Sequence, residues 1–244
     1  MITTFIFDLD DTLVRTEHLK ALSYARAARL LNPGLDEAVA IDAFKPFVGG
    51  ARKDVAKGLL NKLGLEPAAR ARRAEFGVAE PWEVFVALRV PIYNTILADN
   101  ALLERNIIPG NAALLRWAFQ NDYKTGLATM SHLEQTARVL SALHLTNLVG
   151  QLATTEDVQQ GKPAPDIYLF LAKKLGVGID ECLVIEDSPA GVKSAQNAGM
   201  RVIAVTTDYS REAFASGELL DRQYVVDDPA NLLTVVDQVL VQNQ

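Results

Sequence analysis

The sequence predicts an α/β fold: a doubly wound parallel sheet with an all-helical domain inserted after its first strand. Met1–Phe7 is short and apolar and ends abruptly in acidic residues. Residues 16–102 carry only helical patterns, and strand and helix patterns alternate after Pro109. This alternation implies right-handed crossovers and a parallel sheet covered by helices on both faces, which the first strand must join. We therefore expect a Rossmann-like core of residues 1–15 and 103–244.

The first strand and the helical insertion rest on simple patterns. A short run rich in Ile, Thr and Phe favours a buried parallel strand over a helix. Thr16 is placed to cap a helix whose first turn carries Glu17. Helical spacing then continues to about Leu103. We expect breaks at Asn32-Pro33-Gly34, Gly49-Gly50, Gly64, Glu66-Pro67 and Val90-Pro91.

The second half is predicted element by element. The expected strands are Lys124–Thr129, Leu148–Thr154, Cys182–Ile185 and Arg201–Thr206. The expected helices are Asn111–Gln120, Leu133–Leu143, Asp166–Leu175, a helix that begins at Ser188-Pro189, and a terminal helix in "LTVVDQVLV". Ser188 is the expected N-cap of its helix, and Gly176 the expected end of the helix before it.

Composition excludes several classes of function. The 244 residues are 49% hydrophobic and 22% charged, an ordinary balance for a globular protein. A net charge of −6 argues against a general binder of nucleic acid or anionic membranes. The single cysteine, Cys182, rules out an internal disulfide and suits a reducing compartment. No apolar run approaches the ~20 residues of a membrane span. We expect a cytoplasmic, monomeric protein.

Polar residues gather where the predicted strands end. Ligands of open parallel sheets bind beyond these carboxyl ends. The residues expected there are Asp8, Asp10, Asp11, Thr129, Lys162, Glu186 and Asp187. Five carboxylates so close together repel one another, and only a divalent cation together with Lys162 could offset their charge. Carboxylate oxygens select Mg²⁺ over softer metals, so the sequence predicts a magnesium site.

These residues resemble the motifs of the haloacid dehalogenase superfamily, in family order and over nearly the whole chain. The matching segments are "DLDDT", Thr129, Lys162 in "GKPAPDIY", and "EDSPAG". The resemblance implies that Asp8 is a nucleophile that forms an aspartyl-phosphate. It also implies that Asp10 is the general acid and base, and that its backbone carbonyl binds the metal. Thr129 and Lys162 would hold the transferring phosphoryl group.

The resemblance also assigns the remaining acids. Asp187 matches a metal ligand, and Glu186 is expected to act on the metal through water or to orient Lys162. Asp11 stands where many relatives have glycine, and we expect it to form a turn. Because relatives that cleave carbon–halogen or phosphonate bonds lack the second aspartate, Asp10 indicates phosphate-ester chemistry.

Three functions remain open on these grounds. The first is a phosphatase that hydrolyses a small phosphomonoester, plausibly a sugar phosphate. The second is an intramolecular phosphotransferase that resembles β-phosphoglucomutase. The third is a non-catalytic binding domain, which predicts loss of Asp8 or Asp10, although both are present.

The insertion, residues 16–102, resembles the mobile cap domain of the family. Arg52 in "VGGARKDVAKGLL" matches an arginine that binds a non-reacting phosphate, and Arg89 lies in a second cap segment, "LRVPIYNTI". Lys20 occupies the place of a mutase histidine, while His18 lies two positions earlier, which disfavours mutase activity. We expect Arg52, Arg89 and Lys20 to contact substrate. The alternative for each is a solvated helix face.

Overall fold

A computed structural model describes residues 1–242, and the chain forms two compact units. The first unit consists of Met1–Arg15 and Leu103–Gln244, and the second is Thr16–Leu102. The first unit contains a six-stranded sheet in which every pairing is parallel. This confirms the predicted α/β class.

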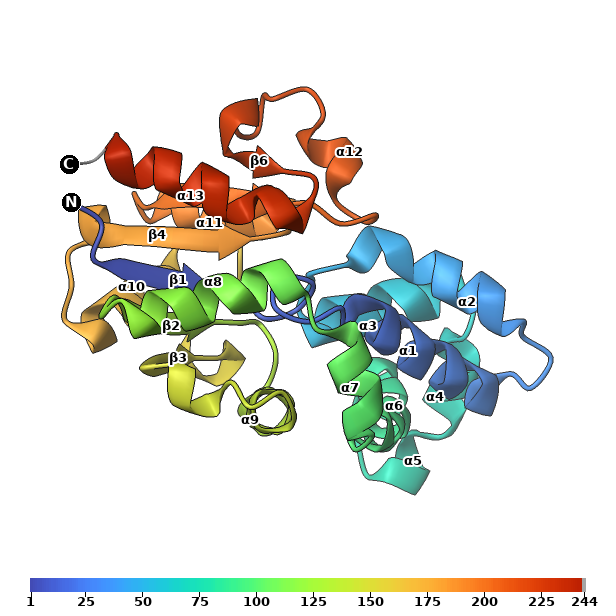
Figure 1. The fold of residues 1–244 in the computed structure, drawn as a ribbon. Coiled ribbons are helices and arrows are strands. Elements are labelled where there is room, and N and C mark those ends of the chain that lie inside the picture. The colour runs from blue at the N-terminus through green and yellow to red at the C-terminus, as the bar shows by residue number, and fades with distance from the viewer. Residues whose placement is uncertain (243–244) are drawn as a thin grey trace. The chain divides into compact units, whose positions relative to one another are not determined.

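The sheet places the first strand of the chain at its centre (Figure 1). The strands are β1 (Thr4–Phe7), β2 (Lys124–Ala128), β3 (Gln151–Ala153), β4 (Cys182–Glu186), β5 (Arg201–Val205) and β6 (Val225–Val226). Their order is β3-β2-β1-β4-β5-β6, and Thr4 is in register with both Lys124 and Cys182. All residues of β1 and β4 are buried, as their continuous apolar runs predict. The sequence analysis missed β6, which has only two residues.

Helices of the first unit cover both faces of the sheet. The α-helices are α8 (Pro109–Gln120), α9 (Leu133–Ala142), α10 (Asp166–Leu175), α11 (Pro189–Asn197), α12 (Arg211–Phe214) and α13 (Leu232–Val241). The 3₁₀ helices are Thr146–Leu148, Thr155–Asp157, Ile179–Glu181, Arg222–Tyr224 and Pro229–Asn231. Helix α8 packs with α13 on one face, and α10 with α11 on the other (Figure 1). Ser188 caps α11 by accepting from Gly191 N, and Gly176 ends α10 with φ 66°, so both predicted boundaries are confirmed.

The second unit is all-helical. It contains α1 (Glu17–Leu31), α2 (Glu37–Phe44), the 3₁₀ helix Lys45–Phe47, α3 (Arg52–Lys62), α4 (Glu66–Ala71), α5 (Arg73–Phe76), α6 (Pro81–Leu97) and the start of α7 (Asn100–Asn106). Thr16 does precede α1, but it has helical φ and ψ and its side chain makes no cap hydrogen bond, so that expectation was wrong. Among residues 1–242, none of the helices has the length and hydropathy that a bilayer span requires.

The predicted break at Val90-Pro91 was also wrong, because α6 continues through Pro91. Proline inside a helix costs about 3 kcal/mol, since it removes a hydrogen bond and crowds the preceding turn. Helix α6 buries residues on both sides of Pro91, among them Phe85 and Tyr93. Each fully buried large apolar side chain contributes about 1.5–3 kcal/mol. Packing against the unit's core therefore outweighs the local preference.

Candidate active site

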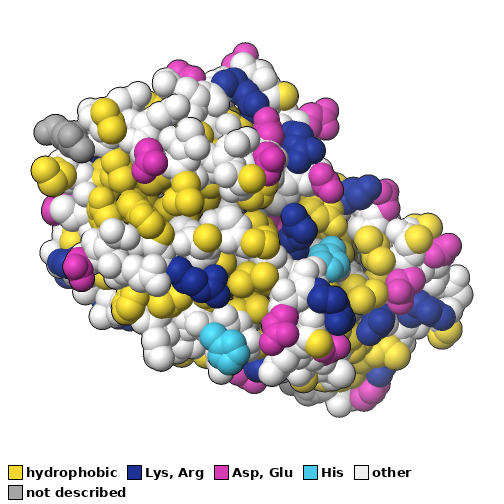
Figure 2. All heavy atoms as spheres, in the orientation of Figure 1, with side chains coloured by type: hydrophobic (Ala, Val, Ile, Leu, Met, Phe, Trp, Pro, Cys, Tyr) yellow, Lys and Arg dark blue, Asp and Glu magenta, His cyan; other side chains and the backbone are white. Residues whose placement is uncertain are grey.

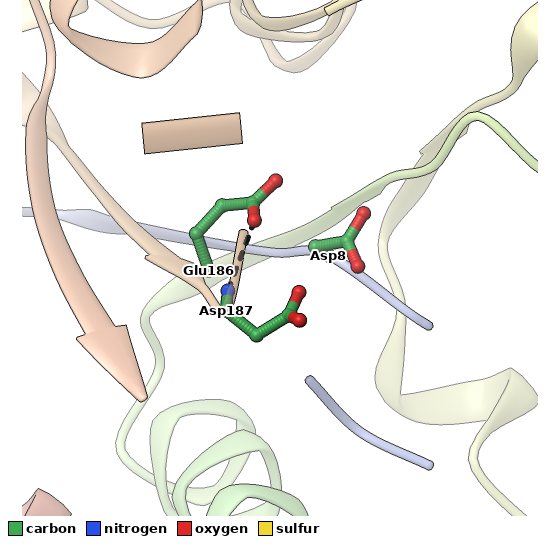
Figure 3. Close-up of side chains that lie close together, drawn as sticks. All are labelled: Asp8, Glu186 and Asp187. Carbon is green, nitrogen blue, oxygen red and sulfur yellow. Dashed lines mark hydrogen bonds between the residues drawn. The ribbon is translucent and has the colours of Figure 1, made fainter. Parts of the chain in front are cut away.

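Three buried acids meet where β1 and β4 end. Asp8 follows β1, Glu186 is the last residue of β4, and Asp187 follows it. One carboxylate oxygen from each lies within 4.8 Å of the others, and Figure 3 shows the three side chains close together. They lie close together because β1 and β4 are parallel neighbours in the sheet, so their carboxyl ends share one edge. The structure thus brings together three of the predicted site residues.

Lys162 links two of these acids. Its Nζ donates to Asp8 Oδ1 at 2.7 Å, to Glu186 Oε1 at 2.6 Å and to the Ala128 carbonyl at 3.1 Å. The Lys162 side chain is only 4% exposed. Burial disfavours its charged form, but Asp8 and Glu186 outweigh this effect and raise the pKa of Lys162 well above its usual value. A fixed cation therefore lies between two carboxylates.

The pKa values of Asp8 and Glu186 shift in opposite directions. Burial raises the pKa of Asp8 to about 8; Lys162 opposes this shift, while the nearby Glu186 and Asp10 add to it. Burial acts in the same direction on Glu186, but Lys162 and hydrogen bonds to its carboxylate lower the Glu186 pKa overall. Of these two acids, Asp8 is the one whose negative charge is less compensated by this chain. A bound cation would stabilise that charge.

Both oxygens of Glu186 are occupied by donors. Oε1 also accepts from the Tyr168 hydroxyl at 2.9 Å. Oε2 accepts from Asp187 N at 2.9 Å, Ser188 N at 3.0 Å and Ser188 Oγ at 3.1 Å. Glu186 therefore holds Lys162 Nζ beside Asp8, and which of its two expected roles Glu186 has stays a prediction. Asp8 and Asp187 are better suited than Glu186 to bind a metal directly, because both oxygens of Glu186 already accept hydrogen bonds.

A glycine makes room for this carboxylate. A Cβ added to Gly191, in the first turn of α11, would lie 1.8 Å from Glu186 Oε1 and 2.2 Å from Oε2. Real Cβ atoms never approach other atoms so closely, so the "EDSPAG" segment needs glycine at this position. The start of α11 can then pack directly against the buried carboxylate.

Thr129 and Asp10 form a second group. Thr129 follows β2, and its Oγ1 donates to Asp10 Oδ2 at 3.4 Å. Ser131 Oγ donates to the same oxygen at 2.5 Å, and Ser131 N donates to Thr129 Oγ1 at 3.0 Å. The sequence analysis did not single out Ser131 or Tyr168. The only available signal for Ser131 was its position two residues after Thr129.

The loop that carries Asp8 and Asp10 turns sharply at Asp11. The φ of Asp11 is 60°, in the left-handed region that glycine adopts without strain. The Asp11 N–H donates to the Val14 carbonyl at 2.7 Å, and Leu13 N donates to the Leu9 carbonyl at 2.9 Å. The predicted turn-forming role of Asp11 is confirmed. Asparagine and aspartate tolerate this conformation better than other non-glycine residues.

The donor set fits a hard divalent cation. The candidate ligand atoms of the triad are carboxylate oxygens, the type that Mg²⁺ prefers. The triad carries more negative charge than Lys162 alone can neutralise, and a metal between Asp8 and Asp187 would remove that imbalance. The buried triad can therefore hold a metal ion.

The three cations predicted in the insertion, Arg52, Arg89 and Lys20, lie in the helical unit and have different surroundings there. Arg89 is 3% exposed; its guanidinium lies 4.6 Å from the Tyr24 ring centroid and 4.1 Å from that of Tyr93. Its Nε donates to Ser23 Oγ at 2.7 Å. The alternative of a solvated helix face is thus wrong for Arg89. Cation–π contacts and this hydrogen bond compensate its burial.

Lys20 and Arg52 differ from Arg89. The Lys20 side chain is 18% exposed and its Nζ forms an ion pair with Glu17 Oε1 at 2.8 Å, so it is not a freely solvated lysine. Arg52 begins α3 and is partly buried, and its carbonyl accepts from the Tyr24 hydroxyl at 3.4 Å.

A parallel Rossmann-like sheet whose edge carries a buried acidic triad and a lysine is the architecture of a haloacid dehalogenase-like hydrolase. A sequence model of that family matches residues 2–199, and the chain belongs to it. Phosphoglycolate phosphatase from Rhodospirillum rubrum is 32% identical over 230 residues, 93% of this chain and 88% of that protein. Hexitol phosphatase A from Escherichia coli is 32% identical over 201 residues, 82% of each chain. The crystal structure of β-phosphoglucomutase from Clostridium difficile shares the fold, with a TM-score of 0.74 and 21% identity over 99% of this chain and 100% of that one.

Proposed function

We propose that this protein is a Mg²⁺-dependent phosphatase that hydrolyses a small phosphomonoester through an aspartyl-phosphate. The observation that carries the proposal is the Asp8–Lys162–Glu186 arrangement beside Asp187, at the edge of the sheet where ligands bind. Two relatives that are 32% identical to this chain, hexitol phosphatase A and phosphoglycolate phosphatase, are phosphatases by name. Nucleophile, cation and metal ligands then occupy one small buried volume.

The proposed chemistry has two steps. Asp8 Oδ attacks phosphorus, the bond between phosphorus and the ester oxygen breaks, and Asp10 protonates the departing alcohol. Water then attacks the phosphorus of the aspartyl-phosphate, Asp10 takes its proton, and inorganic phosphate leaves Asp8 as a carboxylate. Lys162 and Thr129 would hold the transferring oxygens. Mg²⁺ held by Asp8, Asp187 and the Asp10 carbonyl would reduce the repulsion between the two anions.

The substrate class is inferred from the relatives and from the helical unit. The relatives' names indicate phosphorylated polyols and a phosphorylated acid. Contacts of Arg52, Arg89 and Lys20 with a second polar or anionic group of the substrate stay predictions. On the face drawn in Figure 2, basic side chains are mixed with acidic ones, which favours a small metabolite over nucleic acid.

The alternatives make different predictions. A mutase would convert a phosphorylated sugar into its isomer, and Lys20 in place of the expected histidine disfavours it. A binding domain would release no phosphate. A monomeric state and a cytoplasmic location also remain predictions from the sequence.

One experiment separates these functions. The purified protein is incubated with a panel of phosphorylated metabolites and Mg²⁺, and both free phosphate and isomerised products are measured. We expect phosphate release that EDTA abolishes and excess Mg²⁺ restores. Isomerisation without phosphate release would identify a mutase, and turnover in EDTA would contradict the magnesium site.

A further inference from the structure

Two segments of the first unit run beside each other where the loop that carries Asp8, Asp10 and Asp11 ends. They are residues 12–15, which lead out to the helical insertion, and residues 106–111, which return from it. Arg15 N donates to the Asn106 carbonyl at 2.8 Å, and Ile108 N donates to the Leu13 carbonyl at 2.9 Å. Val14 and Ile107 form an antiparallel bridge. All of these contacts between the two segments are made by backbone groups.

One further contact between the two segments is made by a side chain, that of Asn111 in the first turn of α8. Its Nδ2 donates to the Thr12 carbonyl at 2.6 Å, and Asn111 is fully buried. No described residue donates a hydrogen bond to Oδ1 of the same amide. A buried amide oxygen without a donor is costly, so the amide at this position serves through its donor, which pairs with the Thr12 carbonyl.

Thr12 connects this amide to the acidic triad. Its Oγ1 donates to Asp187 Oδ1 at 3.3 Å, and the whole contact is buried. Thr12 is thus held at its carbonyl by Asn111 and holds Asp187 with its hydroxyl. A displacement of the Thr12 backbone would move the hydroxyl away from Asp187. Side chains that orient metal ligands in this way change metal affinity when they are removed.

We infer that Asn111 is a positioning residue for the metal site and acts on Asp187 through Thr12. This inference rests on the proposed Mg²⁺ site and adds a residue that touches neither metal nor substrate. Asn111 lies in α8, the helix after the insertion, and would fix the position of the Asp187 side chain from there.

The test measures Mg²⁺ affinity directly, by calorimetric titration of the protein without substrate. Asn111→Ala removes the donor, and Asn111→Thr keeps the side-chain volume while its hydroxyl is one bond closer to the backbone than Nδ2. We expect the Kd for Mg²⁺ to rise about 10-fold for both variants. Asn121→Ala is the matched control, because Asn121 ends the same helix and its exposed Nδ2 donates to the Trp117 carbonyl at 2.8 Å. Its Kd should equal that of the wild type.

A double-mutant cycle tests the route. Thr12→Val removes the hydroxyl that reaches Asp187, and we expect it to raise the Kd by a similar factor. Because the two residues act in series, Asn111→Ala combined with Thr12→Val should bind Mg²⁺ no more weakly than the weaker single variant. Additive losses would overturn the inference, and so would an unchanged Kd in the Asn111 variants.

Two further outcomes keep the inference separate from the proposed function. If the wild type binds no Mg²⁺, the metal site itself is refuted. If the Asn111 variants do not fold, nuclear magnetic resonance of the wild type decides: the Asn111 side-chain amide signals should shift when Mg²⁺ is added. Signals that stay unchanged while Mg²⁺ binds would overturn the inference and leave the phosphatase proposal standing.

Discussion

Lys162 Nζ lies 2.7 Å from Asp8 Oδ1, so the proposed nucleophile is already paired with a cation of the same chain. The same Nζ reaches Glu186, which keeps Lys162 in place if the charge on Asp8 is removed. Changes to Asp8 and changes to Lys162 should therefore have unequal effects on stability.

Asp8→Asn should abolish turnover and leave the fold intact. The amide cannot form an aspartyl-phosphate, while burial already disfavours the charged carboxylate at this position. Phosphate release should fall below a few per cent of the wild-type rate, and the thermal melting temperature should not fall. Residual activity above that level would rule out Asp8 as the nucleophile.

Lys162→Met should destabilise the protein strongly when Mg²⁺ is absent. The substitution leaves Asp8 and Glu186 buried without their shared cation, and breaking a buried ion pair costs about 3–5 kcal/mol. Added Mg²⁺ should raise the melting temperature of this variant more than that of the wild type, because the metal supplies the missing charge. Lys174→Met is the control, since the exposed Lys174 donates to the Leu152 carbonyl and should change little. Equal melting temperatures for the two variants would contradict the expectation.

Gly191→Ala should reduce both stability and activity. The added Cβ would overlap the Glu186 carboxylate, so either α11 or Glu186 must shift, and Lys162 would shift with it. We expect a loss of about 1–3 kcal/mol in chemical unfolding, the usual cost of overpacking. Gly34→Ala provides the comparison, because a Cβ at Gly34 meets only Asn32 Oδ1, at 3.5 Å. A Gly191→Ala variant with wild-type kinetics would show that the site tolerates movement of Glu186.

Arg52→Ala should raise KM mainly for substrates that carry a second anionic group. A guanidinium binds a remote phosphate or carboxylate through two hydrogen bonds, and a neutral aryl phosphate offers no such group. The loss in kcat/KM should correspond to about 2–4 kcal/mol for the doubly anionic substrate. An equal loss of kcat/KM for both substrates would show that Arg52 has a structural role. An unchanged kcat/KM for both would show that its side chain is solvated and contacts neither substrate.

Cys182 should remain a protonated thiol throughout the neutral range. Burial raises its pKa to about 11, and Glu181 and Asp180 add to the shift. In the unfolded chain the thiol ionises near pH 9. Stability from the neutral thiol is therefore fully present below pH 9 and is lost as the pH rises towards 11. Urea unfolding at pH 7.5 and 10.5 should show a larger loss for the wild type than for Cys182→Ala, and thiol reagents should react only after unfolding.

Strand ends were the part of the site that the sequence could predict. Asp8, Glu186 and Asp187 each follow a strong strand pattern, and parallel strands deliver such residues to one edge. Lys162 lies in a loop, so no strand or helix pattern indicated it, and only its resemblance to the family motif "GKPAPDIY" did. Ser131 reaches Asp10 only through the path of the chain after β2, which no local pattern specifies.

Helix packing explains the expectations that failed. Local rules predicted a break at Pro91 and offered a solvated helix face as the alternative for Arg89, and both rules describe isolated helices. In the folded unit α6 buries residues on either side of Pro91, and the rings of Tyr24 and Tyr93 flank Arg89. Asn111 escaped notice for the same reason, because its partner, Thr12, is brought near only by tertiary structure.

The central place of β1 has a consequence for how the protein folds during synthesis. β1 leaves the ribosome well before both of its partners, since Thr4 pairs with Lys124 and Cys182. Such non-local pairings form slowly, because a long loop must close before any contact stabilises it. The helical segment 16–102 forms a compact unit of its own and can fold before β1 has its partners. Until then the apolar residues and unpaired edges of β1 are exposed to aggregation or to chaperones. The nascent chain thus has no complete acidic triad until β4 and Asp187 have emerged.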